Sequence, residues 1–173
     1  MKKRAFPKNL KFGTYLPIGS GVRLIEISSA VSSLQRFLNE YFDGIAAIKS
    51  SADTHKGESL YLDGEHTAYL FRLIMAAIYD HAVIDINIDT TDREFTICFS
   101  TKGKYDISDL GVYEELVKAA QKSGFAILFT KNEIALRAAI VRGKIVISAI
   151  TAKDFGETLA RVFFATHDTP SDE

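Results

Sequence analysis

The 173-residue sequence contains a single cysteine, Cys98, so an internal disulfide and a metal site built from several cysteines are excluded. Cys98 lies in an apolar stretch, where a free cysteine usually behaves as a small hydrophobic residue. The histidines do not form a metal-binding pair on a helix either, because no two of them are three or four residues apart. They are His55, His66, His81 and His167. The sequence therefore gives no support for a metal site.

Long apolar runs are also missing, and none approaches the ~20 residues that a membrane-spanning helix needs. The N-terminus is basic, but the apolar stretch of a secretory signal does not follow it. A net charge of −1 gives no overall field to attract nucleic acid or a membrane. Aromatic residues lie at core spacings rather than between lysines, unlike an RNA-binding sheet. We therefore expect a cytoplasmic protein without a specific nucleic-acid signal.

Two common catalytic motifs are absent as well. The sequence has no G-x-S-x-G nucleophile motif and no phosphate loop of the G-x-x-x-x-G-K type. His66 is the remaining candidate, because Asp63 and Glu65 next to it suggest an acid–base group or a phosphoacceptor. The simpler interpretation is the first turn of a helix, where both carboxylates favour the helix dipole.

The composition is that of one globular domain. Hydrophobic residues make up 47% of the chain and charged residues 25%, as in ordinary soluble proteins. We assign residues 1–22 to an extended N-terminal arm, 23–165 to a single α+β domain and 166–173 to an acidic tail. The arm is locally basic, and could touch phosphates or anionic lipid, although a solvated terminus is the more common arrangement. Its cationic residues are Lys2, Lys3, Arg4, Lys8 and Lys11.

Hydrophobic periodicity predicts helices that alternate with strands. Apolar residues three and four apart predict helices at 28–48, 64–81, 112–123 and 153–164, the third of them ended by Gly124. Period-two alternation and short apolar runs predict strands at 10–16, 60–63, 83–89, 94–100, 125–130, 134–141 and 144–150. Grouped helices and a mostly antiparallel sheet give a two-layer α+β sandwich.

This order of elements, with Asp63 closing a strand before a helix, resembles the ATP-binding domain of sensor histidine kinases and the wider gyrase and heat-shock-chaperone ATPase family. The resemblance covers roughly residues 28–150. It implies a histidine kinase-like ATPase topology, a two-layer α/β sandwich in which helices lie on one face of a mixed, mainly antiparallel sheet.

The magnesium-binding helix of that family follows a pattern close to L-x-N-L-L-x-N-A-x-K. The matching run here begins at Leu70, and it keeps the apolar positions. The two positions four residues apart that carry the catalytic and metal-binding groups become Arg72 and Ala76, and the basic position becomes Tyr79. Alanine offers no oxygen to magnesium, and arginine neither binds a cation nor acts as a base at neutral pH.

The adenine-binding motif of the family, D-x-G-x-G, has an equally weak counterpart. Thr101 replaces the aspartate, Gly103 keeps one glycine, and Tyr105 replaces the other. Thr101, Gly103 and Lys104 form a remnant of a nucleotide site, whereas Arg72, Ala76, Tyr79 and Tyr105 line the cleft. We predict that the bulky side chains close this cleft, with Tyr79 packed on Tyr105. In the alternative, an open cleft, Arg72, Lys102 and Lys104 would favour a small anion or an acidic partner segment. The family's glycine-rich lid is absent from the sequence.

The resemblance thus implies a non-catalytic regulatory or protein-binding domain on a degenerate ATPase fold, without a cofactor and with a protein partner that the sequence does not identify. An alternative is a divergent ATP-binding protein kinase of the anti-sigma-factor type, which would use ATP and magnesium. A third possibility is an unrelated α+β sandwich whose pattern coincides with that of the family.

Overall fold

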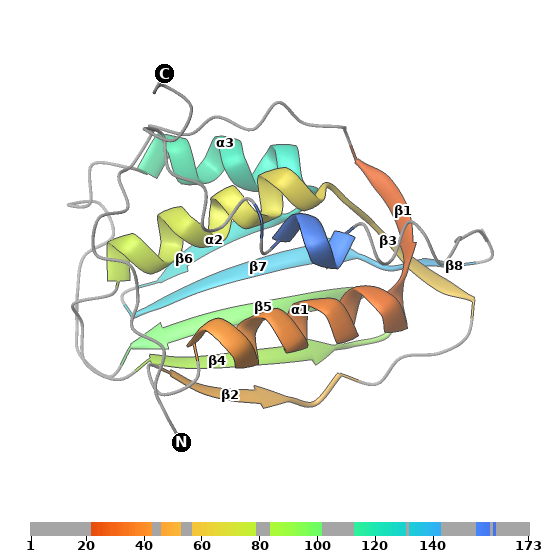
Figure 1. The fold of residues 1–173 in the computed structure, drawn as a ribbon, viewed down its shortest axis with the longest axis horizontal. Helices are drawn as coiled ribbons and strands as arrows, with labels where there is room; N and C mark the ends of the chain where they lie inside the picture. Colours follow the sequence, from red (N-terminus) through yellow and green to blue (C-terminus); the bar gives the residue numbers. More distant parts are fainter. Residues whose placement is uncertain are drawn as a thin grey trace.

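The computed structural model describes residues 22–42, 46–52, 57–78, 84–101, 113–130, 132–142, 155–159 and 161. They form a layer of helices against a five-stranded sheet, with a smaller sheet at one end (Figure 1). The strand predicted at 10–16 and that at 144–150 lie outside the described residues, as do most of the arm and the whole acidic tail. Of the helix predicted at 153–164, residues 155–159 are described and helical.

The larger sheet has the strand order β2-β4-β5-β7-β6. Its strands are β2 (Ala46–Ser50), β4 (Ile84–Thr90), β5 (Glu94–Thr101), β6 (Ala126–Thr130) and β7 (Glu133–Ala139). Strand β2 runs parallel to β4, and all the other pairings are antiparallel. Alternate residues of the central strands are fully buried, which is the period-two pattern that predicted these strands. The expected mixed, mainly antiparallel sheet is confirmed.

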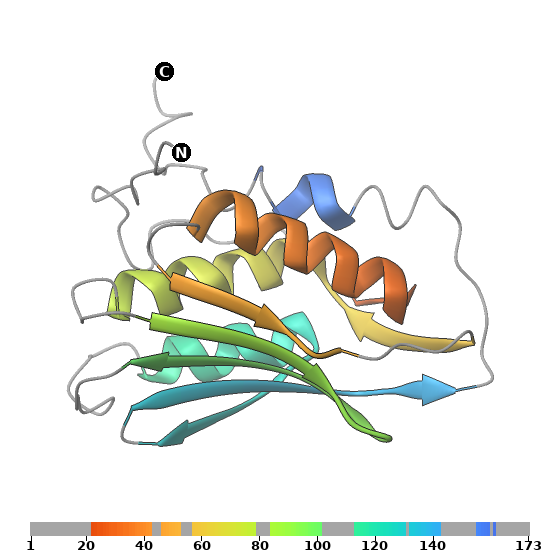
Figure 2. The ribbon, with the colours of Figure 1, turned by 90° about the horizontal axis from the view of Figure 1, so that it is seen from below.

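Three helices supply the second layer: α1 (Ile27–Phe42), α2 (Gly64–Ile78) and α3 (Tyr113–Ser123). Figure 2 shows α1 and α2 together on one side of the sheet. Buried residues of all three helices belong to the same hydrophobic core as the central strands. Phe71 of α2 lies at the centre of this core, between Phe37 of α1 and Phe99 of β5. The predicted two-layer arrangement is confirmed.

A second, three-stranded sheet was not predicted. It consists of β1 (Arg23–Glu26), β3 (Glu58–Leu62) and β8 (Val141–Arg142), paired antiparallel in the order β1-β3-β8. Arg142 stabilises the pairing of β8 with β3, since its Nε donates to Oε2 of the buried Glu58 at 3.1 Å. The predicted strand at 134–141 therefore needs correction, because β7 ends at Ala139 and Val141 pairs in this other sheet.

The prediction for the first helix was wrong at its C-terminal end. A helix was expected at 28–48, but α1 ends at Phe42 and Ala46 already begins β2. Ile45 continues the apolar spacing of the helix, and alanine is a strong helix former, so the local sequence favours helix. Parallel pairing with β4 outweighs that preference. The other helices agree with expectation, although residues 79–81 of the second lie outside the described part.

The end of α3 brings three elements together. Gly124 follows the helix with φ +104°, a left-handed conformation that suits glycine. Its N–H donates to the carbonyl oxygen of Ala120 at 3.1 Å. The backbone of Tyr61 in β3 passes so close that a Cβ on Gly124 would clash with the Tyr61 carbonyl oxygen. A glycine at this position lets α3, β3 and the strand after α3 meet.

Candidate functional site

Helix α2 carries the residues that correspond to the family's magnesium site. Every residue from Thr67 to Ile74 is buried, so this helix is enclosed by protein around its whole circumference over that stretch. Arg72 is among them, with only 4% of its surface exposed. A buried arginine is unusual, because a guanidinium stays charged at any physiological pH and needs polar partners.

Tyr69 joins α2 to α3, because its hydroxyl donates to Oε2 of Glu115 in α3 at 3.3 Å. Arg72 follows almost one turn later, and Ala76 lies one turn beyond Arg72. The two positions thus share a helix side, as the family pattern requires.

Some of the predicted site residues lie within the described part of the chain. Thr101 is the last residue of β5 and is paired with Ile84 of β4. Gly103, Lys104, Tyr79 and Tyr105 lie outside the described residues, and with them the predicted closure of the cleft by the two tyrosines. Arg72, Ala76 and Thr101 are therefore the predicted residues that the structure places, on α2 and at the end of β5.

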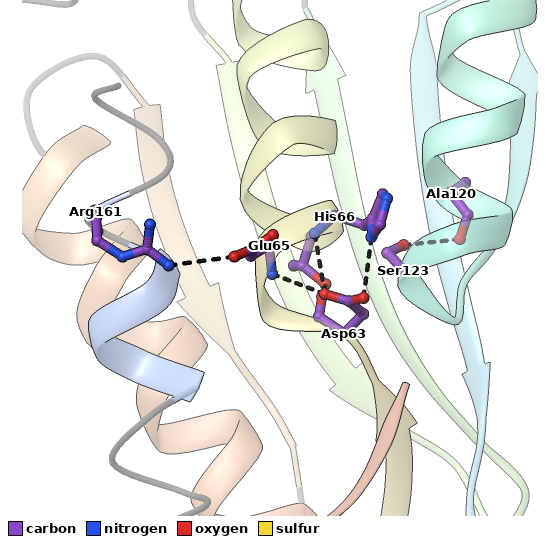
Figure 3. A network of polar contacts seen from close by, with 7 residues as sticks. Asp63, Glu65, His66, Ala120, Ser123 and Arg161 are labelled. Carbon is purple, nitrogen blue, oxygen red and sulfur yellow. Dashed lines mark hydrogen bonds and ion pairs between the residues drawn. The ribbon is translucent and has the colours of Figure 1, made fainter. Parts of the chain in front are cut away.

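A polar network surrounds the beginning of α2 (Figure 3). Asp63, which is 1% exposed, accepts hydrogen bonds at Oδ1 from the backbone N–H groups of Glu65 at 2.9 Å and His66 at 3.3 Å. Its Oδ2 lies 3.0 Å from Nδ1 of His66. This is an N-cap, in which a carboxylate satisfies backbone donors that a helix leaves unpaired.

The pairing of His66 with Asp63 also orients the imidazole, as a carboxylate does in an acid–base dyad. The partners that the structure gives Asp63, however, lie in the first turn of α2 or at its junction with α3. The Asp63 N–H donates to the carbonyl oxygen of Ser123 at 2.9 Å, and the Ser123 hydroxyl donates to Ala120 at 2.7 Å. Glu65 contacts Arg161 at 3.4 Å. The geometry fits the structural role that the sequence analysis favoured.

We expect Asp63→Ala to lower the free energy of unfolding by about 2–3 kcal/mol, since it removes the cap and leaves buried donors without an acceptor. Asp63→Asn is the matched control, because an amide oxygen can still accept the two backbone bonds, and it should cost about 1 kcal/mol. Urea unfolding followed by circular dichroism measures both. Equal stability of the alanine variant and the wild type would contradict the role of Asp63 as a buried cap.

Cys98 is the one thiol of the chain and lies half-buried in β5. Burial raises the pKa of Cys98, and the negative charges of Glu133 and Asp89 raise it further. A thiol with a raised pKa is mostly protonated at neutral pH and reacts slowly as a nucleophile. Within the described ranges, no cluster of three or more histidine, cysteine, aspartate or glutamate side chains could hold a metal ion.

Neither a scan against protein-family models nor a search of curated proteins gives a match. Solved structures do match. The chain is similar in fold to a histidine kinase from Acinetobacter baumannii, AdeS, with 8% identity, a TM-score of 0.47 and coverage of 68% of this chain. It spans 66% of the AdeS chain.

Two further histidine kinases are similar in the same way. The cytoplasmic segment of QseC matches at 12% identity and a TM-score of 0.44, over 78% of this chain and 85% of that one. The catalytic domain of ThkA matches at 11% identity and a TM-score of 0.43, over 70% of this chain and 96% of that one. The similarity concerns the fold alone. Identities and TM-scores this low support no inference about activity.

Residues that connect α2 with its surroundings were missed by the sequence analysis. Neither the contact from Tyr69 to Glu115 nor the bond from Asp63 to Ser123 has a local sequence signal, because each joins segments far apart in the chain. Separately, none of the helices in the described part of the chain is long and apolar enough to cross a membrane.

Proposed function

We propose that this chain is a non-catalytic regulatory or protein-binding domain, built on a histidine kinase-like ATPase fold that does not use magnesium and ATP. The observation that carries the proposal is the buried Arg72 on α2, at a position where the family pattern has an asparagine. The scaffold of the fold is kept, whereas the polar groups for metal and adenine are replaced.

The side chains at the catalytic and metal-binding positions, Arg72 and Ala76, oppose magnesium binding. Mg²⁺ takes oxygen ligands in near-octahedral geometry, and a guanidinium has only N–H donors. Arg72, on the same helix side as Ala76 by helical periodicity, therefore offers a divalent cation no ligand. At the adenine end, Thr101 can still accept a hydrogen bond, but it lacks the charge of an aspartate. Both changes point away from nucleotide turnover.

We expect magnesium–ATP at millimolar concentration to leave the melting temperature within about 1 °C of that of the free protein. A ligand present at about 100 times its Kd adds about 2.7 kcal/mol, which raises the melting temperature of a chain of this size by roughly 5–10 °C. Differential scanning fluorimetry with ATP, ADP and magnesium measures the shift, with inorganic phosphate as the control for unspecific anion effects.

A rise of that size with ATP or ADP, absent with phosphate and lost in Thr101→Val or Gly103→Ala, would overturn the proposal. It would favour the alternative of a small ATP-binding protein kinase of the anti-sigma-factor type. Transfer of labelled phosphate from ATP to a protein would then be the second measurement.

A further inference from the structure

The two outer strands of the five-stranded sheet, β2 and β6, differ in how they are protected. An edge strand exposes backbone N–H and C=O groups, and proteins usually keep other strands from pairing there with lysine, proline, a bulge or a very short strand. Strand β2 carries Lys49 in this way. Strand β6, from Ala126 to Thr130, contains no charged residue and no proline.

In Figure 2, β6 forms the lower margin of the sheet. Among the described residues, β7 is the one strand that pairs with it. Both faces of the sheet near this margin present exposed apolar side chains. Leu128 is 51% exposed, and Tyr113 at the beginning of α3 is 49% exposed, with its ring 4.9 Å from that of Phe129.

From these features we propose that β6 pairs antiparallel with β6 of a second copy of this chain, across a two-fold axis at Leu128. The two five-stranded sheets then continue into one sheet. This inference does not depend on whether the domain binds a nucleotide, so the two proposals can fail separately.

The sequence of β6 matches itself in this arrangement. With the axis at Leu128, each Leu128 lies opposite its copy, Ile127 lies opposite Phe129, and Ala126 lies opposite Thr130. None of these pairs brings like charges together, which would oppose pairing, and two of them join large apolar side chains. Leu128 and Ile127 point to opposite faces of the sheet, so apolar surface is covered on both.

The same self-pairing is disfavoured at β2. A two-fold axis at Ile48, the centre of that strand, places Lys49 opposite Ala47 and brings two lysines into the same short interface. Strand β6, which carries no charged residue, is therefore better suited to self-pairing than β2. Each copy contributes one five-residue strand and one tyrosine to this interface, so the contact area is small. We therefore expect a dimer dissociation constant on the order of 1–100 µM.

Sedimentation equilibrium of the full chain over a concentration series tests the proposal. We expect a monomer–dimer equilibrium, and Leu128→Lys should weaken it by at least about a hundredfold, because two lysines then lie opposite each other at the axis. The control is Ala47→Lys, which adds a lysine to an exposed position of the other edge strand and should leave the equilibrium unchanged. Circular dichroism confirms that both variants are folded.

Cysteine cross-linking tests the register. Directly opposite residues of antiparallel strands have Cα atoms about 4.5–5.5 Å apart, within reach of a disulfide. In a Cys98→Ser background, Leu128→Cys should therefore cross-link to its own copy under mild oxidation. Ala126→Cys should not, because its copy lies about 13 Å away along the strands.

Several results would overturn the proposal. One is a protein that stays monomeric at about 1 mM, which would leave β6 to a different partner. Another is a dimer that Ala47→Lys disrupts and Leu128→Lys does not. Growth into oligomers beyond the dimer would contradict a closed two-fold pairing, and equal cross-linking of the two cysteine variants would contradict the register.

Discussion

Gly124→Ala should lower the free energy of unfolding by about 4 kcal/mol, enough to lower the melting temperature by roughly 10 °C. Two effects add. A residue with a Cβ is strained at φ +104°, and the new methyl group would also clash with the Tyr61 carbonyl oxygen. Because that oxygen belongs to backbone rather than to a flexible side chain, either α3 or β3 has to move. Thermal and urea unfolding followed by circular dichroism measure the loss.

Gly57→Ala separates the two effects. Gly57 has a similar φ of +87°, but no atom lies within 4 Å of the position that its Cβ would take. The strain of the left-handed conformation is therefore the main cost, and we expect a loss of about 1–2 kcal/mol. Equal losses in the two variants would show that the close approach of Gly124 to β3 contributes nothing.

Phe71→Ala should cost about 3–5 kcal/mol, the range found for a large aromatic side chain removed from a core. Phe71 is fully buried, and its ring centroid lies 5.7 Å from that of Phe37 and 5.8 Å from that of Phe99. The ring thus joins α2 to α1 on one side and to the sheet on the other. Its removal leaves a cavity in the centre of the two layers.

Phe71→Leu is the matched control, because leucine fills part of the space and keeps the contacts apolar. We expect it to cost about 1–2 kcal/mol, which equilibrium unfolding in urea distinguishes from the alanine variant. A near-neutral alanine variant would mean that the core collapses around the missing ring, and would contradict a rigid junction between the layers.

Elements with strong local signals were predicted correctly. The hairpin of β4 and β5 alternates apolar and polar residues around a polar turn, and Asp63 marks the beginning of α2. The end of α1 and strand β2 were not predicted, because residues such as Ala46 and Ala47 have helix-favouring chemistry and become a strand only beside β4. Strands β1 and β8 are too short to show any periodicity, and they exist through pairing with β3.

The candidate site was only partly predictable. The sequence placed Arg72 on a helix, which the structure confirms, whereas the burial of this arginine was not predicted, because charged side chains are usually exposed. The contact of Tyr69 with Glu115 depends on how α2 packs against α3, which no local pattern encodes. The same holds for the position of β6 as an outer strand among the described residues, since a strand becomes an edge only through the order of its neighbours.

The pairing of β3 with β8 has a consequence for how the chain assembles. Glu58 and Arg142, which join these strands, are 84 residues apart, whereas β4 and β5 are connected by a short turn. Closing a long loop costs more chain entropy, so the local hairpins should form early and the β3–β8 contact late. The small sheet is then the part that opens first during partial unfolding, and hydrogen exchange should be fastest in β8 among the described strands.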